Sequence, residues 1–240
     1  MNFLKPFKKL IPPTFKSDIK DHLGVPSLSW SLQNIKKAGY KPGVVYDIGA
    51  YEGYWALDFL KVFPNSPIYM FEAQQTKEAF LKKIVNTRSN LHYSMALLGA
   101  KDGVAVTFEE NETASHVNIS VQGTNNTNRI TENLDQLIER NKYPLPDFLK
   151  LDVQGYELEV LKGANTALVN AEFCLLEISL IDLGGGCPLL LDVVNFMDAK
   201  AFCAYDISQF IRRPFDKALW QIDMLFIKKN SSFISEKRWD

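Results

Sequence analysis

Two glycines join a predicted strand to a predicted helix in the stretch Tyr46-Asp47-Ile48-Gly49-Ala50-Tyr51-Glu52-Gly53-Tyr54-Trp55. Gly49 permits a tight turn because it has no Cβ, and Gly53 opens the helix that follows. In doubly wound sheets, a turn of this kind at the carboxyl end of the first strand lies beside the nucleotide-binding crevice. The stretch therefore predicts an adenosine-binding site at this turn.

The turn lacks the features of a phosphate site. Dinucleotide-binding turns follow the pattern GxGxxG, whereas Tyr51 takes the place of the second glycine. The carboxylate of Asp47 would also repel a pyrophosphate. An acid in the turn suits a cationic ligand, and S-adenosylmethionine has a cationic amino group and no phosphate. The sequence thus favours the methyl donor over a nicotinamide dinucleotide.

A second acid, Glu72, stands at the end of the next predicted strand. It follows Asp47 at about the separation at which an acidic side chain reaches the ribose hydroxyls of a bound adenosine. Its two oxygens can accept both hydrogen bonds. The alternative is that the turn is a simple connection and that Glu72 is a solvated strand end.

Short apolar runs alternate with amphipathic helical stretches from Val44 onward, which is typical of a parallel sheet with helices on both faces. Strands are expected at residues 44–48, 68–71, 92–97, 148–152, 173–178, 202–207 and 222–227. Helices are expected from Ser27 to Gly39 and near residues 55–62, 80–85 and 131–138, with Thr131 as the cap of the last. The pattern predicts an α/β fold, with a hairpin and a polar loop inserted at residues 101–129.

The composition fits one globular domain, because 46% of the 240 residues are hydrophobic and 23% are charged. Lys and Arg number 27 and Asp and Glu 28, so no overall field attracts nucleic acid, and we expect no such partner. No apolar run approaches the roughly 18 residues that cross a bilayer. We divide the chain into a helical extension at 1–42, a main domain at 43–229 and a polar tail at 230–240 that is expected to fray.

The first residues and the cysteines bear on location. Three lysines alternate with apolar side chains at residues 1–11, so this segment could lie on an anionic membrane surface; docking on its own domain is favoured because the segment is short. Residues 1–10 show no secretory signal pattern, and Cys174, Cys187 and Cys203 are spaced too widely for a disulfide framework or a zinc clamp. We expect a cytoplasmic protein with at most a peripheral contact with the inner face of the membrane.

Three segments resemble the FkbM family of S-adenosylmethionine-dependent methyltransferases. Residues 47–53 resemble its DxGAxxG motif, Phe71-Glu72-Ala73 its FEP segment, and Phe148-Leu-Lys-Leu-Asp-Val-Gln-Gly-Tyr-Glu157 its lKxDvEGxE block. Gln154 stands where many members have Glu, and Ala73 replaces the usual proline. The resemblance implies a Rossmann-like class I methyltransferase fold, with a seven-stranded, mostly parallel sheet and helices on both faces.

The reaction centre is expected where the strand at 148–152 ends. Asp152 is the candidate general base or orienting acceptor for a hydroxyl proton, and Glu157 is the second candidate. Gln154 has lost the charge of the usual acid and is expected to orient ligands. Lys150 is expected to point away from the centre. His116, in the polar insertion, is a third candidate base, although an ordinary loop histidine is favoured.

The implied cofactor is S-adenosylmethionine, and no metal site is predicted because no ligand spacing is recognisable. The expected cofactor-binding residues are Asp47, Gly49, Ala50, Tyr51, Glu52, Gly53, Glu72, Ala73, Met95, Ala96, Asp152 and Gln154. The resemblance implies O-methylation of a sugar or another small hydroxylated acceptor, as in polysaccharide biosynthesis. A non-catalytic S-adenosylmethionine-binding scaffold and a nicotinamide-dependent oxidoreductase stay open as alternatives.

Overall fold

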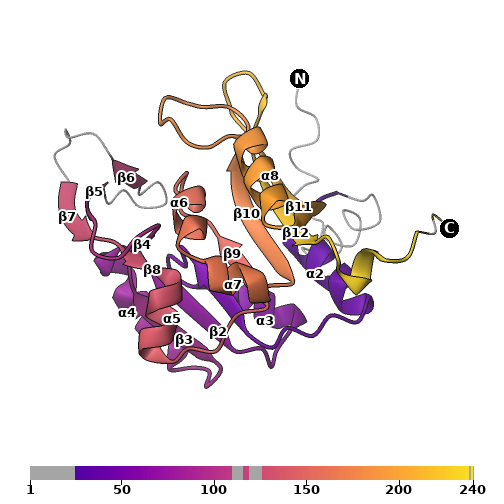
Figure 1. Cartoon of the computed structure of the whole chain (residues 1–240), viewed down its shortest axis with the longest axis horizontal. Helices are drawn as coiled ribbons and strands as arrows, with labels where there is room; N and C mark the ends of the chain where they lie inside the picture. The colour runs from indigo at the N-terminus through magenta and orange to yellow at the C-terminus, as the bar shows by residue number, and fades with distance from the viewer. Residues whose placement is uncertain (1–24, 110–115, 119–125, 238, 240) are drawn as a thin grey trace, which may run out of the picture.

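A seven-stranded sheet forms the centre of the computed structural model (Figure 1). The structure describes residues 25–109, 116–118, 126–237 and 239. Across the sheet the strands follow the order β11, β12, β10, β9, β1, β2, β3. Their bounds in chain order are β1 Val45–Ile48, β2 Ile68–Glu72, β3 Leu91–Met95, β9 Phe148–Leu151, β10 Phe173–Ser179, β11 Phe202–Arg212 and β12 Leu219–Lys228.

Most of the sheet is parallel. β3, β2, β1, β9 and β10 run in one direction, and β12 is antiparallel to both β10 and β11. β1 pairs with β2 on one side and with β9 on the other, so the chain winds outward in both directions from this point. Open α/β sheets bind their ligands at such a switch point, beyond the carboxyl ends of the strands. The predicted Rossmann-like α/β fold is confirmed.

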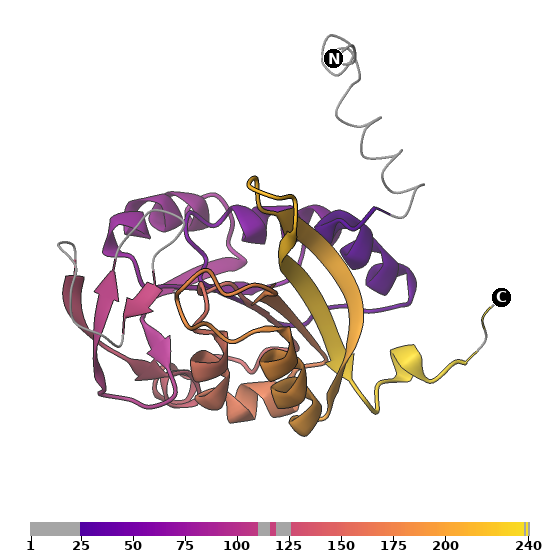
Figure 2. The ribbon, with the colours of Figure 1, turned by 90° about the horizontal axis from the view of Figure 1, so that it is seen from above.

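Helices cover both faces of the sheet (Figure 2). One apolar core lies under α2, α3 and α4, and the other lies under α5, α6, α7 and α8. The helix bounds are α2 Leu28–Lys37, α3 Tyr54–Val62, α4 Glu78–Val85, α5 Leu134–Asn141, α6 Glu157–Lys162, α7 Asn165–Asn170 and α8 Leu190–Ala199, with a 3₁₀ turn, η2, at Gln75–Lys77. Since both faces are covered, β1 and β9 are buried at every position.

The first described helix, α2, begins where the sequence predicts. The Ser27 hydroxyl caps it by accepting from the Trp30 N–H at 3.1 Å. Leu32 and Ile35 are buried against the sheet side of the helix. α2 contacts α3 and β11, and the Ser31 hydroxyl donates to Asp206 Oδ2 at 2.7 Å. This end of the predicted extension is therefore part of the packed fold.

Two smaller sheets lie beside the carboxyl edge of the main sheet: β4 (Leu98–Gly99) pairs with β8 (Glu132–Asn133), and β5 (Ala105–Glu109) pairs with β6 (His116–Asn118) and β7 (Asn126–Ile130). The β5–β7 pair agrees with the predicted hairpin.

The prediction that Thr131 caps α5 is wrong. Asn133 caps this helix by accepting from the Gln136 N–H at 3.1 Å, because the Thr131 hydroxyl already donates to the Lys101 carbonyl at 2.7 Å.

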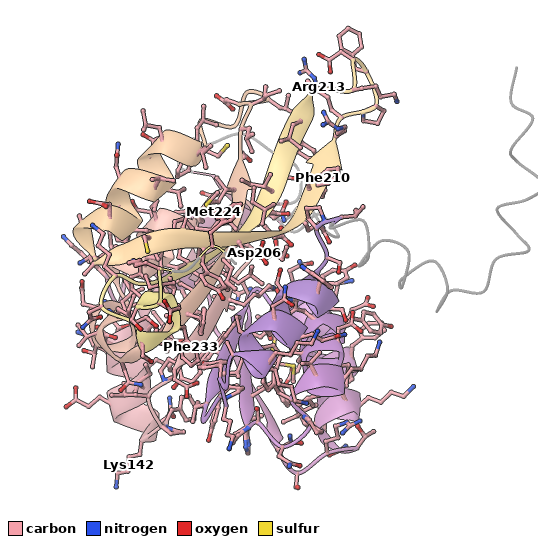
Figure 3. The ribbon with its side chains drawn as sticks, turned by 90° about the vertical axis from the view of Figure 1, so that its right-hand side faces the viewer. Lys142, Asp206, Phe210, Arg213, Met224 and Phe233 are labelled. Atoms are coloured by element: carbon pink, nitrogen blue, oxygen red, sulfur yellow. The ribbon has the colours of Figure 1, made fainter. Side chains whose placement is uncertain are left out.

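The end of the chain is partly packed where the sequence predicts fraying. A 3₁₀ turn, η4 (Ser232–Ile234), places the Phe233 ring 5.9 Å from the Tyr40 ring and 5.8 Å from the Phe173 ring (Figure 3). Residues 1–11 lie outside the described residues, so their membrane contact stays a prediction. In the part of the chain that the structure describes, no helix has the length and apolar character to span a bilayer.

Candidate active site

A cavity of about 430 Å³ opens at the carboxyl edge of the sheet, which is a usual size for a small-molecule site. Its walls come from the turn after β1, the ends of β2, β9 and β10, and the base of the β11–β12 hairpin. Among the described residues that line it, the carboxylic acids are Glu72, Asp152 and Glu177, and none is Arg, Lys or His. Bound phosphates usually contact Arg or Lys side chains. This lining therefore favours a phosphate-free ligand.

The turn after β1 is fixed on two sides. The N–H groups of Gly49 and Ala50 both donate to the Phe71 carbonyl, at 2.9 and 3.1 Å. Gly49 has φ +75°, and a Cβ on it would stand 1.9 Å from the Asp152 carbonyl oxygen, so only glycine fits. The turn therefore touches the end of β2 and the end of β9 at once.

Glu72 lies under this turn with 5% of its surface exposed. Its Oε2 accepts from the Tyr51 N–H at 2.6 Å, and its Oε1 accepts from the Gln74 N–H at 2.7 Å. Burial raises the pKa of Glu72, and these backbone donors oppose the shift. Each carboxylate oxygen keeps a lone pair for a further donor. The carboxylate is thus held in one orientation at the cavity wall.

Asp47 and Lys150 form a buried ion pair beneath the turn. Asp47 is fully buried, and its Oδ1 lies 3.0 Å from Lys150 Nζ, which also donates to the Gly49 carbonyl at 2.9 Å. Burial alone would lower the pKa of Lys150, but the carboxylates of Asp47 and Asp152 outweigh it and raise the pKa. The expectation that Lys150 points away from the centre is wrong: Nζ lies 3.7 Å from Asp152 Oδ2. A lysine in a buried strand cannot reach solvent and needs an acid as its partner.

Gln154 links two carboxylates at the cavity. Its Nε2 donates to Asp152 Oδ1 at 2.8 Å and to Glu177 Oε2 at 2.9 Å. The residue has φ +54°, so the loop after β9 turns sharply here. The amide is neutral, so it holds the two acids together without adding a charge of its own.

Glu177 is the most strongly perturbed of these acids. Burial raises its pKa to about 9, and the neighbouring carboxylates of Asp152 and Asp223 add to the shift. Burial also raises the pKa of Asp223, to about 6. At neutral pH, Glu177 is therefore protonated. The acid that Gln154 holds beside Asp152 is then neutral and does not repel the Asp152 carboxylate.

We predict that the stability of the fold falls as the pH rises toward 9. The pKa of Glu177 is about 9 in the folded chain against an ordinary value of 4.5, so the folded chain binds this proton more tightly. The stabilisation is complete below the ordinary value and is lost as the pH rises through the folded value. Glu177→Gln, which keeps an acceptor for Gln154, should reduce this pH dependence. Urea unfolding from pH 6 to pH 9.5 measures the effect.

The matched control for this experiment is Asp58→Asn, which changes an exposed acid on α3. Its unfolding midpoints should follow the unchanged protein at each pH. Equal pH dependence in the Glu177→Gln variant and the unchanged protein would show that Glu177 does not hold the proton.

The sequence profile described as "Methyltransferase FkbM domain" matches residues 47–207, which is more than half of the chain. The chain belongs to the FkbM methyltransferase family. Residues 47–207 are accordingly a methyltransferase domain of this family. Over 44 residues, or 18% of each chain, it is 48% identical to the hexuronic acid methyltransferase AglP of Haloferax volcanii, so the matched segment spans under a fifth of that relative's length.

Two solved structures align with this chain at low sequence identity. A precorrin-6y C5,15-methyltransferase from Geobacter metallireducens aligns with a TM-score of 0.49 and 13% identity, over 83% of this chain and 87% of that one. The magnesium protoporphyrin IX methyltransferase ChlM from Synechocystis aligns with a TM-score of 0.47 and 8% identity, over 91% of this chain and 85% of that one.

The residues of this FkbM-family chain fit S-adenosylmethionine. The cavity has room for a nucleoside, Glu72 presents a fixed carboxylate, and the Gly49 turn leaves space that a Cβ would close. Of the cofactor residues predicted from sequence, seven line the cavity: Gly49, Tyr51, Glu72, Ala73, Ala96, Asp152 and Gln154. The other five do not line it: Asp47, Ala50, Glu52, Gly53 and Met95.

These five residues have other contacts. Asp47 is paired with Lys150, and Glu52 Oε1 lies 3.2 Å from Lys77 Nζ. Gly53 opens α3 with φ +78°, where a Cβ would lie 3.1 Å from the Ile84 side chain. Ala50 and Met95 pack in the apolar core. The predicted contact between Asp47 and a cationic ligand is therefore replaced by its contact with a lysine of the same chain.

Glu157, one of the predicted catalytic residues, does not line the cavity. Glu157 is 3% exposed, and its Oε1 accepts from the N–H groups of Val153 and Gly155 at 3.0 and 3.1 Å. Burial raises its pKa to about 7 despite these donors. It therefore shapes the loop after β9, while Glu159 is the half-exposed helix-face acid, paired with Lys162. The side chain of His116 lies outside what the structure describes.

Several lining residues are not among the site residues that the sequence predicts. They are Gln74, Leu97, Leu98, Phe108, Val153, Tyr156, Glu177, Ile211, Trp220 and Gln221. Glu177 closes a predicted strand, which was a usable signal because strand ends form the site in such sheets. Trp220 and Gln221 reach the cavity because β12 inserts beside β10, with Gln221 opposite Ser179. The pairing of β12 with β10 depends on the topology of the sheet, so it could not be predicted from the local sequence pattern.

We predict that Glu72→Ala weakens S-adenosylmethionine binding by about 1–3 kcal/mol, because a buried carboxylate with fixed oxygens is lost. Isothermal calorimetry with the donor and with its demethylated product measures the change. Glu52→Ala is the matched control, since Glu52 is a turn acid that does not line the cavity, and its affinity should stay close to the original. Unchanged affinity in Glu72→Ala would place the ribose partner elsewhere.

Proposed function

We propose that the protein transfers the methyl group to a hydroxyl oxygen of a sugar or another small hydroxylated acceptor. The carrying observation is the Asp152 carboxylate, which is 39% exposed at the cavity and fixed through Oδ1 by the Gln154 amide. Bound S-adenosylmethionine supplies an electrophilic methyl group on a sulfonium. The chain must hold the hydroxyl of the acceptor near this methyl group, accept its proton and exclude water.

In this proposal, the turn half of the cavity holds the donor. Glu72 accepts from the ribose hydroxyls through the lone pairs that Tyr51 and Gln74 leave open. Phe71, Ala73 and Leu97 give apolar walls for the adenine ring. The acidic lining favours the positively charged end of the donor, whereas a nicotinamide dinucleotide would bring its pyrophosphate to these acids.

The hairpin half of the cavity receives the acceptor. Trp220 offers a ring face for the apolar side of a sugar, and Gln221 offers hydrogen-bonding groups. Asp152 takes the hydroxyl proton as the new bond forms, and Gln154 keeps its carboxylate in place. Since Asp152 is an acid and no described lining residue is basic, we expect the reacting face of the acceptor to be uncharged.

The short segment shared with a hexuronic acid methyltransferase supports a sugar acceptor. A hexuronic acid has neutral hydroxyls on most of its ring, so a carboxylate turned away from Asp152 and Glu177 is compatible with the acidic lining. Placed at the reacting end, the same carboxylate would be repelled.

The test uses methyl-labelled donor, the full chain and two sets of acceptors, which are neutral glycosides and hexuronic acids. Mass spectrometry identifies the molecule that gains the methyl group, and formation of the demethylated donor gives the rate. The expected result is an O-methylated sugar, with neutral glycosides at least as good as hexuronic acids.

Three results would contradict the proposal. Methylation of nitrogen or carbon acceptors alone would remove the hydroxyl assignment. Binding of the donor without any methylated product from either set or from a metabolite extract would favour the non-catalytic scaffold. NAD binding at similar strength to S-adenosylmethionine would favour the oxidoreductase.

A further inference from the structure

The β11–β12 hairpin extends beyond the carboxyl edge of the sheet. Ser179, the last residue of β10, lies opposite Gln221 of β12, so the residues between Ile211 and Gln221 continue past the end of that neighbouring strand. Figure 3 shows Arg213 at the outer end of the hairpin and Phe210 nearer the sheet. We define residues 210–219 as the hairpin tip.

The hairpin tip combines exposed aromatic rings with positive charge. Phe215 is 91% exposed and Phe210 is 42% exposed. The tip has three basic side chains, Arg212, Arg213 and Lys217, and one acid, Asp216. An exposed phenylalanine gains free energy when it leaves water for an apolar environment. Basic groups beside it are attracted to anionic groups such as lipid headgroups.

Hydrogen bonds within the tip hold Phe215 outward. The Arg213 N–H donates to the Ala218 carbonyl at 3.0 Å, and the Lys217 N–H donates to the Arg213 carbonyl at 3.1 Å. Asp216 accepts from the Ala218 N–H at 2.9 Å and is paired with Arg213. Backbone groups that are already bonded can enter an interface without losing water partners. Asp216 is neutralised by Arg213, which leaves Arg212 and Lys217 to define the charge of the tip.

We propose that the hairpin tip docks on the surface of an anionic lipid bilayer. Phe215 enters the boundary between headgroups and acyl chains, while Arg212 and Lys217 contact lipid phosphates. Ile211 of the tip and Trp220 and Gln221 just below it form part of the cavity wall. Docking therefore brings the cavity close to the bilayer, where an acceptor displayed on a lipid is presented to it.

The test measures binding of the full chain to vesicles by co-sedimentation, with phosphatidylcholine alone and with phosphatidylcholine plus phosphatidylglycerol. We expect binding to the anionic vesicles that weakens as salt is raised. Phe215→Ser should weaken it about tenfold, because an apolar side chain is removed from the interface. Lys217→Glu should weaken it by a similar factor, because a contact with phosphate becomes a repulsion.

Each variant has a matched control elsewhere on the chain. Val169→Ser removes another exposed apolar side chain, 78% exposed near the amino end of β10. Lys142→Glu reverses an exposed lysine at the opposite end of the molecule, and Lys142 has φ +54° where Lys217 has φ +66°, so the backbone demands are similar (Figure 3). Both controls should bind as the unchanged protein does, and thermal melting should show all four variants folded.

The readout is independent of methyl transfer, so this proposal and the proposed function can fail separately. Absence of binding to anionic vesicles would overturn it. So would binding that Phe215→Ser and Lys217→Glu leave unchanged, which would assign the contact to another segment, such as residues 1–11. Equal binding to neutral vesicles would also overturn it, because the basic side chains would then contribute nothing.

Discussion

Asp152→Asn should lower the turnover of methyl transfer about 10²- to 10⁴-fold, the usual contribution of a positioned proton acceptor. Asparagine keeps the shape of the side chain, and its oxygen can still accept from Gln154, so the cavity should persist. It cannot take the hydroxyl proton. The affinity for S-adenosylmethionine should change little, so the loss should fall on turnover and leave donor binding nearly intact. Steady-state rates and calorimetry on the same preparation separate the two.

Asp58→Asn serves as the control, because it makes the same chemical change at an exposed acid on α3. It should leave turnover unchanged. If Asp152→Asn turned over at the original rate, Asp152 would have no part in proton transfer, and another group would have to accept the proton.

Lys150→Met should lower the free energy of unfolding by about 3–5 kcal/mol, because it leaves the carboxylate of Asp47 buried without its partner. Asp47 is fully buried, and among the described residues no hydrogen-bond donor of good geometry reaches either of its oxygens. The same variant removes the hydrogen bond from Nζ to the Gly49 carbonyl. Urea unfolding gives the change directly.

The double variant Lys150→Met with Asp47→Asn tests the electrostatic cause. A neutral amide costs less to bury than an unpaired carboxylate, so the double variant should be more stable than Lys150→Met alone. Equal stabilities would mean that the cost of losing Lys150 comes from packing or from the Gly49 contact, and that the charge on Asp47 is not the source.

Local patterns were sufficient for the main elements of the fold. Apolar runs located all seven strands of the sheet, and the i, i+4 spacing of Leu28 and Leu32 located α2. Strand ends were less well placed. β11 continues to Arg212 and β12 begins at Leu219, so both strands are longer than the apolar runs that predicted them. The outer parts of β11 and β12 pair only with each other, beyond the rest of the sheet. They cover no core there, so their sequence shows no alternating apolar pattern.

The site was only partly visible in the sequence. Glu72 and Asp152 were found because they end strands, and the topology brings those ends to one cavity. Lys150 was misread because its partner depends on register: Asp47 and Lys150 are neighbours across the β1–β9 pair, which no spacing along the chain reveals. A lysine between two buried leucines was the available sign that an acid had to lie beside it.

The absent side chain at Gly49 has a consequence for the order of events during turnover. No methyl group fits between Gly49 and the Asp152 carbonyl, so the turn after β1 packs directly against the residue that follows β9. A movement of the turn should therefore also move Asp152. A donor that settles against that loop will also steady the carboxylate awaiting the second substrate. We therefore expect ordered kinetics, in which the donor binds first and the acceptor binds second.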